Sequence, residues 1–188
     1  MQFPKSYKCL TKNVFRKDGF KIIPIRFQDR MDVMKWRNEQ IHHLRQDKPI
    51  SVAVQNSYFE NVVAKLFDED KPSQILFSFL ENDICIGYGG LVHINWSDKN
   101  AEISFIMNTE LEDIFFSKYW SIYLEVLEKI GFDELNYHKL FVYAFDLRPH
   151  LFIMLEENKY FLDARLKDHC YFRGSFKDVV IYSKICEK

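Results

Sequence analysis

Three apolar runs, in which polar residues recur between the apolar ones, lie in the middle of the chain. Residues 74–80, 84–94 and 101–107 are rich in Ile, Phe, Val and Leu, a composition typical of β-strands. Asn82-Asp83 lies between the first two runs and favours a tight hairpin turn, and a polar turn over residues 95–100 follows the second. The pattern therefore predicts three consecutive antiparallel strands.

The second of these strands contains an unusual concentration of glycine. The run Gly87-Tyr88-Gly89-Gly90 has no helix directly after it, so it does not fit a dinucleotide-binding or phosphate-binding loop. Glycine inside a strand usually marks a bulge or a place where another backbone comes close. We expect a bulged strand here.

A helical period appears in four other segments. Over residues 117–130 the apolar positions recur every three or four residues, at Trp120, Tyr123, Leu124, Leu127 and Ile130, which more often indicates core packing than a binding stripe. Helices are also predicted over residues 29–39, 51–66 and 149–158. Each of these three begins at a residue suited to a helix start: Asp29, Ser51 and Pro149.

The remaining apolar runs complete a mixed sheet. Strands are expected over residues 21–26, 140–145, 160–172 and 177–185, with Pro24 placing the first at an edge. The order β-α-α-β-β-β-α-β-α-β-β predicts an α/β (α+β) fold with a mostly antiparallel central sheet and about four helices. We expect one domain over residues 1–188, in which residues 1–20 form a leader with weak strand character.

Composition and charge narrow the class of protein. The chain has 188 residues and a net charge of −1, with no excess of basic residues to hold a nucleic acid. Its four cysteines are scattered and show no metal-binding spacing, so we expect reduced thiols and no metal. The polar, basic start lacks the apolar segment of a signal peptide, and no apolar run is long enough to cross a membrane, which favours the cytoplasm.

Six short motifs occur in a fixed order over roughly residues 21–185. They are Trp36-Arg37-Asn38, Ile86-Gly87-Tyr88-Gly89-Gly90-Leu91, Ala101-Glu102-Ile103-Ser104-Phe105, Leu135-Asn136-Tyr137-His138-Lys139-Leu140, Leu155-Glu156-Glu157-Asn158-Lys159-Tyr160 and Arg165-Leu166-Lys167-Asp168-His169. Their order and spacing resemble the ribosomal-protein and amino-sugar branch of the GNAT N-acetyltransferases. The resemblance implies the GNAT fold.

It also implies transfer of an acetyl group from acetyl-CoA to a primary amine, with the acceptor between the first two helices and two splayed strands. A small acceptor such as an amino sugar is favoured because the balanced charge offers no docking surface for a ribosome. The alternatives are a protein N-terminal acetyltransferase and a non-catalytic module that kept the fold. A homodimer is possible.

The resemblance places the coenzyme A pyrophosphate at a glycine-rich loop that opens the central helix. Here that position reads Asp113-Ile114-Phe115-Phe116-Ser117-Lys118-Tyr119-Trp120, with no glycine. We expect backbone N–H groups near Ser117 to serve the phosphates, as unpaired donors at a helix start do. Phe115 and Phe116 are expected to line the pantetheine arm or to pack under the helix. The full set of expected donor contacts is Ile106, Met107, Asn108, Phe115, Phe116, Ser117, Lys118 and Arg148.

Glu102 is the candidate catalytic residue. Strand alternation places Glu102, Ser104 and Ile106 on one face, and a carboxylate inside a central strand is costly to bury without a partner. An attacking amine must lose a proton, directly or through water, and a carboxylate can accept it. The alternative is a Glu paired with a nearby Lys or exposed on the open side of the sheet.

His93 ends the preceding strand, and the turn over residues 95–100 can bring it close to Glu102 as a second base, a substrate contact or a structural group. The expected acceptor-binding residues are Trp36, Arg37, Asn38, His42, Tyr88, His93 and His169. His42 and His43 are adjacent, so they cannot share one face of a helix. His169 and Asp168 either line the pocket or form a bonded pair in the core. His138 is expected to be a structural turn residue.

Overall fold

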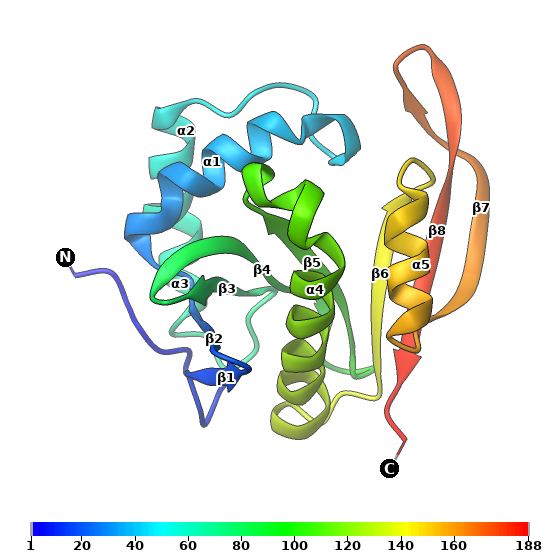
Figure 1. The fold of residues 1–188 in the computed structure, drawn as a ribbon. Helices are drawn as coiled ribbons and strands as arrows, with labels where there is room; N and C mark the ends of the chain where they lie inside the picture. Colours follow the sequence, from blue (N-terminus) through cyan, green and yellow to red (C-terminus); the bar gives the residue numbers. More distant parts are fainter. Residues whose placement is uncertain (1, 188) are drawn as a thin grey trace.

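In the computed structural model, which describes residues 2–187, one eight-stranded sheet runs through the molecule (Figure 1). The strand order is β1-β2-β3-β4-β5-β6-β8-β7, and every pairing is antiparallel except β5 with β6. The strands are β1 (Phe15–Lys17), β2 (Phe20–Pro24), β3 (Ile75–Glu81), β4 (Ile84–Asn95), β5 (Asn100–Met107), β6 (Lys139–Phe145), β7 (Phe161–Phe172) and β8 (Ser175–Ile185). The predicted fold class is confirmed.

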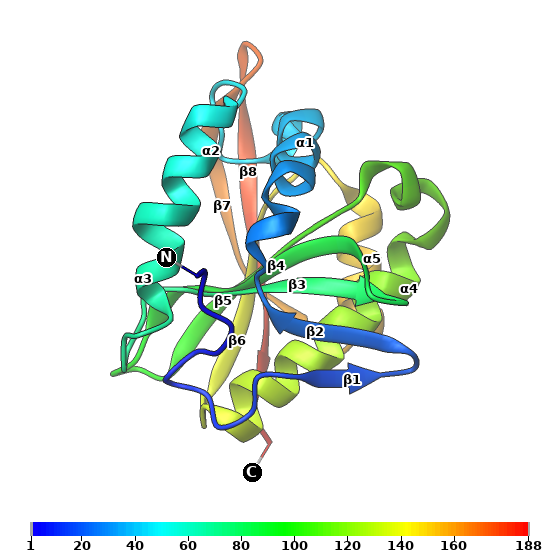
Figure 2. The same cartoon turned by 90° about the vertical axis from the view of Figure 1, so that its left-hand side faces the viewer.

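Helices cover both faces of this sheet. They are α1 (Arg30–Glu39), α2 (Val52–Tyr58), α3 (Ala64–Leu66), α4 (Thr109–Glu128) and α5 (Pro149–Glu157). A π-helical turn, Phe59–Val63, joins α2 to α3, another, Lys129–Glu134, follows α4, and short 3-10 turns lie at Phe27–Asp29 and Ile41–His43. Figures 1 and 2 together show α1 and α2 on one face, and α4 and α5 on the other.

The local signals for turns and caps produce the expected structures at Asn82-Asp83 and Ser51 but not at Asp29. Asn82 and Asp83 have φ angles of 50° and 65°, so a two-residue turn with left-handed backbone joins β3 to β4. The Ser51 side chain accepts a hydrogen bond from the Val54 N–H and caps α2. Asp29 occupies the N-cap position of α1 but does not cap it, because its carboxylate binds Arg26 and Ser78 instead.

The glycines of β4 permit close contact with both neighbouring strands. A Cβ on Gly89 would lie 2.0 Å from the Ser104 carbonyl oxygen of β5, and a Cβ on Gly90 would lie 1.9 Å from the Ile75 oxygen of β3. The β3–β4 register also shifts between Phe79 and Leu80. The predicted bulge and close approach are both present.

The first twenty residues contribute more to the core than their weak pattern suggests. β1 lies within this segment, and the fully buried Tyr7 ring stacks on Phe67 with a centroid separation of 4.0 Å. The Tyr7 hydroxyl donates to the Leu76 carbonyl oxygen and accepts from the Leu76 N–H, which ties the segment to β3.

One prediction about the central helix is wrong. The expected loop at residues 113–118 is helical, because α4 begins at Thr109, immediately after β5. Asn108 caps it by accepting from the Glu110 N–H, and Glu110 and Glu112 in the first turn suit the positive end of the helix dipole. Ser117 therefore lies in the third turn, where its N–H belongs to the helix ladder and is not free for a phosphate.

Strands β5 and β6 diverge in the middle of the sheet. They pair only where Asn100–Glu102 runs beside Lys139–Phe141, and no register continues beyond Glu102. The gap separates the half of the sheet that contains β1–β5 from the half that contains β6, β8 and β7 (Figure 1). The two predicted splayed strands are thus present, and their divergence positions the candidate site.

Candidate functional site

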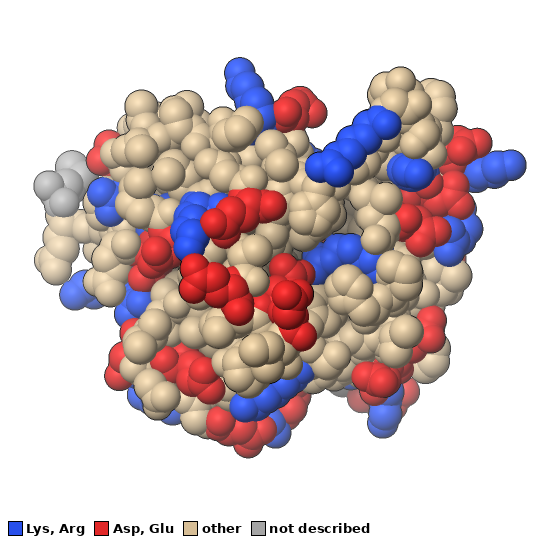
Figure 3. Space-filling view, turned by 45° about the horizontal axis from the view of Figure 1, so that its top comes forward, with Lys and Arg blue, Asp and Glu red and all other residues tan. Residues whose placement is uncertain are grey.

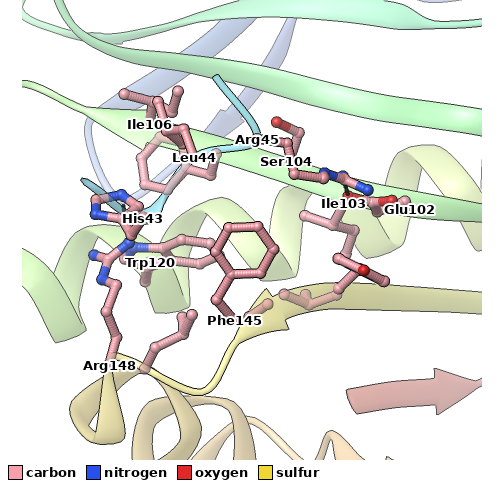
Figure 4. Close-up of a pocket in the computed structure, with 15 residues that line it drawn as sticks. His43, Leu44, Arg45, Glu102, Ile103, Ser104, Ile106, Trp120, Phe145 and Arg148 are labelled. Atoms are coloured by element: carbon pink, nitrogen blue, oxygen red, sulfur yellow. Dashed lines mark hydrogen bonds and ion pairs between the residues drawn. The ribbon is translucent and has the colours of Figure 1, made fainter. Parts of the chain in front are cut away.

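A cleft lies between the diverging strands. Its walls are residues 102–106 of β5 and 142–145 of β6, and residues 43–45, which follow α1, lie over it. Trp120 of α4 and Arg148 at the start of α5 also line it, and Figure 4 shows these side chains directed into the same space. Because the facing edges of β5 and β6 are unpaired here, their backbone groups are free to bind an extended, amide-containing chain.

Glu102 is held at one end of this cleft by two cationic or protonatable partners. The residue is 5% exposed, and its Oε1 accepts a hydrogen bond from Arg45 Nη2 at 2.5 Å. Its Oε2 lies 2.7 Å from His93 Nδ1. The side chain is therefore neither exposed nor paired with a lysine, in contrast to the alternative considered from the sequence.

His93 links this buried carboxylate to solvent. A register irregularity in the β4–β5 pairing between Val92 and Asn95, with a φ of 47° at His93, turns the ring toward Glu102. The His93 side chain is 62% exposed. Its Nδ1 faces Glu102 Oε2, so the ring lies between the buried carboxylate and solvent. The expected proximity of His93 and Glu102 is confirmed.

Arg45 spans the cleft above Glu102. Its guanidinium binds the Glu102 carboxylate and also lies 4.5 Å from the centroid of the Tyr143 ring on β6. This combination of an ion pair and a cation–π contact fixes the carboxylate against both walls.

A second charged cluster lies at the other end of the cleft. Arg148 Nη2 donates to Glu112 Oε1, and Nη1 lies 3.0 Å from His43 Nε2. The side chains of Arg148 and Glu112 are only 12% and 19% exposed. Burial, followed by the neighbouring Arg148 charge, lowers the pKa of His43 to about 3, so the neutral ring accepts a hydrogen bond from Arg148.

The start of α4 does not provide the glycine-lined anion site that the resemblance implies. Asn108 already accepts from the N–H groups of Glu110 and Leu111, and Thr109 donates to Glu39. Figure 3 shows acidic side chains gathered beside a hollow that contains basic side chains. At this end of the cleft the cationic side chain that lines the space is Arg148, and its charge is paired with Glu112.

A second cavity of about 330 Å³ lies on the α1 and α2 face of the sheet. Arg37, Tyr58, Gln74 and Tyr88 supply polar groups to a lining that is otherwise mostly apolar. Ser104 of β5 lines both this cavity and the cleft, so both spaces lie against the strand that carries Glu102.

The expected donor-binding residues are found in different environments. Ile106 lines the cleft, whereas Met107 is buried and its carbonyl oxygen accepts from Gln40. Phe115 stacks on Tyr119 with a centroid separation of 5.1 Å. Phe116 is 8% exposed and packs on Trp120 and His150, while Ser117 and Lys118 are exposed on the helix. Both rings pack against other aromatic rings of α4 and α5, and their expected contact with the pantetheine arm stays a prediction.

The expected acceptor-binding residues also lie in different environments. Arg37 and Tyr88 line the second cavity, but Trp36 is buried in the core at 3% exposure. Asn38 bonds both backbone groups of Ile50 and so has a structural role. His42 is exposed beside His43.

His169 lies outside both cavities, on the exposed strand β7, with its ring 6.4 Å from that of Tyr143. The exposed Asp168 bonds through its N–H to Asp178, so it forms no core pair with His169.

Sequence reasoning did not find Arg45, and it did not find the partners that His43 and Glu112 have in the site. His43, Arg45 and Glu112 come from loops or helix starts, where no periodic pattern indicates direction. Their partners are distant in the chain: Arg45 and Glu102 are 57 residues apart, and His43 and Arg148 are 105 apart. Charge was the available signal for Arg148 and Glu112, since two mostly buried side chains of opposite charge stabilise each other.

Other site types find no support among residues 2–187. No group of three or more His, Cys, Asp or Glu side chains in this range could hold a metal ion, and Cys9, Cys85, Cys170 and Cys186 are free thiols. Over the same residues, no helix combines the length and apolar character that crossing a membrane requires.

Comparison with known proteins agrees with the fold. Residues 22–171 match the family model described as an acetyltransferase (GNAT) domain. The structure of spermidine N-acetyltransferase from Vibrio cholerae in complex with CoA and spermine is 16% identical, with a TM-score of 0.76, covering 90% of this chain and 96% of that one. A chimera of the Vibrio cholerae enzyme with hSSAT is 17% identical, with a TM-score of 0.71 and coverages of 89% and 96%. Because the family model spans most of the chain, the protein belongs to the GNAT acetyltransferase family.

Proposed function

We propose that this N-acetyltransferase moves an acetyl group from acetyl-CoA to the primary amine of a small acceptor, with Glu102 accepting the proton of the amine through water. The observation that carries the proposal is the buried Glu102 carboxylate, bonded to the solvent-linked His93 at the edge of the cleft. General bases of this kind typically contribute about 10²- to 10⁴-fold to a rate.

The reaction that fits this arrangement is direct attack. The amine nitrogen attacks the thioester carbonyl carbon, a C–N bond forms, and the C–S bond breaks to release the coenzyme A thiolate, which takes up a proton from solvent. Glu102 takes the proton that the nitrogen loses and passes it to solvent through His93. A backbone N–H of β5 near Ile106 or Met107 is proposed to polarise the carbonyl oxygen.

The cleft supplies the remaining contacts with the donor. The unpaired edges of β5 and β6 suit the two amides of the pantetheine arm. The phosphates are proposed to lie near Arg148, since the start of α4 has no glycine and presents Glu110 and Glu112. We therefore expect coenzyme A to bind more weakly than it would to a glycine-lined loop.

A transfer assay tests this proposal. The purified chain is incubated with acetyl-CoA and a panel of amines comprising glucosamine, spermidine, leucine and a short peptide, and thiol release and acetylated products are measured. Amine-dependent thiol release with a matching product is expected. Failure to acetylate any of them, together with no calorimetric binding of acetyl-CoA at millimolar concentration, would contradict it and favour a non-catalytic module.

A further inference from the structure

The second cavity contains one cationic side chain and no anionic one. Its lining includes Arg37 but no Asp or Glu. Arg37 Nε donates to Gln46 Oε1 at 3.0 Å, and Nη1 donates to Tyr88 Oη at 2.9 Å. Both acceptors are neutral, and no carboxylate among residues 2–187 forms an ion pair with Arg37.

This environment differs from those of the arginines at the cleft. Arg45 is paired with Glu102, and Arg148 is paired with Glu112. A half-buried guanidinium without an acidic partner loses hydration and gains no opposing charge in return. An anionic group of a ligand would complete the environment of Arg37, and the planar guanidinium matches the two oxygens of a carboxylate.

The rest of the cavity indicates the body of that ligand. Its apolar lining residues are Ile25, Val33, Ile50, Val54, Phe59, Leu76 and Val92. The volume of about 330 Å³ lies at the lower end of the range for small-molecule sites, which is roughly 300–1,000 Å³. The lining fits a small apolar side chain better than the hydroxyl groups of a sugar.

The cavity also has the right position for an acceptor. Ser104 belongs to its wall and to the wall of the cleft. Glu102 is two residues before Ser104 on the same strand, so the two side chains share a face. A ligand with its anionic group on Arg37 can direct its other end past Ser104 toward Glu102.

We propose that the acceptor is a small, amino-acid-like amine whose carboxylate binds Arg37 and whose apolar side chain fills the second cavity. This inference rests on the proposed function and narrows its substrate class. A polyamine would bring further positive charge to a cavity that has a cation and no carboxylate, so the spermine bound by the Vibrio cholerae enzyme is not expected to fit here. Tyr88, which accepts a hydrogen bond from Arg37, is a positioning residue.

Binding of a product-like pair of probes tests the anion site without catalysis. N-acetylleucine carries the carboxylate, and N-acetylleucinamide has nearly the same shape without the charge. We expect calorimetry to show at least about tenfold tighter binding of the acid to the wild-type chain. The preference should disappear in Arg37→Gln and partly survive in Arg37→Lys.

Arg30→Gln is the matched control, since Arg30 lies on the same helix but bonds Asn56 and the Phe27 carbonyl outside the cavity lining. It should keep the preference for the acid. If Arg37→Gln does not fold, as judged by circular dichroism, Tyr88→Phe provides the second variant and should reduce the preference. Equal binding of acid and amide to the wild type, or an unchanged preference in both Arg37→Gln and Tyr88→Phe, overturns the inference.

A transfer assay with leucine, leucinamide and spermidine separates this inference from the proposed function. Preference for leucine supports both. Preference for leucinamide or spermidine overturns the inference while acetyl transfer stands. If the acid binds through Arg37 but no amine is acetylated, the anion site stands and the proposed function fails.

Discussion

Replacing Glu112 with Gln is expected to strengthen coenzyme A binding and weaken the fold. The Glu112 carboxylate forms an ion pair with Arg148 at the end of the cleft where we propose that the phosphates bind. Gln has nearly the same size and can still accept a hydrogen bond from Arg148, but it carries no charge. The substitution therefore removes both the competing anion and the repulsion of phosphate.

The magnitude follows from Coulomb's law. A phosphate charge roughly 7 Å from the carboxylate is repelled by about 2 kcal/mol at an effective dielectric constant near 20. Screening by solvent and salt at the open end of the cleft reduces this to about 1 kcal/mol, or roughly fivefold in affinity. Loss of one charge of a mostly buried pair costs about 1–2 kcal/mol of stability when a hydrogen bond remains, less than the ~3–5 kcal/mol for deleting a partner outright.

Calorimetric titration with coenzyme A measures the first effect, and thermal unfolding measures the second. Glu110→Gln is the control, because Glu110 lies on the same first turn but is exposed and paired with Lys35, so its effect on affinity should be smaller. Unchanged or weaker coenzyme A binding in a folded Glu112→Gln protein would refute the placement of the phosphates at Arg148.

Three further predictions concern the fold. Burial lowers the pKa of His43 from 6.5 to about 3, so between these pH values the unfolded chain binds more protons than the folded one, and the free energy of unfolding should fall as pH drops from about 6.5 toward 3. In His43→Gln, urea unfolding should show a smaller dependence of stability on pH over this range. Equal slopes for the variant and the wild type would contradict the lowered pKa of His43. Gly89→Ala should destabilise by about 3 kcal/mol or more, because its Cβ would meet the Ser104 carbonyl oxygen, and a loss below ~1 kcal/mol in thermal unfolding would show that β5 can shift. Tyr7→Phe should cost about 1–3 kcal/mol by removing the hydroxyl that accepts from the Leu76 N–H, whereas the Leu76 carbonyl keeps the Ile25 N–H as a donor; no loss in denaturant unfolding would mean that residues 1–20 are not anchored through this contact.

Local signals were sufficient to predict much of the sheet. The Asn82-Asp83 pair specified a turn with left-handed backbone, and the Ser51 cap and the alternation around Glu102 were read directly from the sequence. These features depend on neighbouring residues only. Glu102 itself stood out because a carboxylate in an apolar strand requires a partner.

The start of α4 could not be placed in the same way. Glu110 and Glu112 stabilise the N-terminus of a helix that begins at Thr109, and Asn108 caps it. The resemblance implies a loop further along the chain, at residues 113–118, and so places the start of this helix too late. His93 was predicted near Glu102 because a short turn joins their strands, whereas Arg45 and the partners of Arg148 depend on tertiary packing between distant segments.

The central claim is that Glu102 accepts the proton of the attacking amine. The most direct test is the pH dependence of the acetyl-transfer rate for the wild type and Glu102→Gln, with acetyl-CoA binding and thermal stability measured alongside. The account predicts a ~10²- to 10⁴-fold loss in rate with little change in acetyl-CoA binding, and a loss that shrinks at high pH, where the acceptor amine is already neutral. A folded Glu102→Gln protein that keeps near wild-type turnover across the pH range would contradict it.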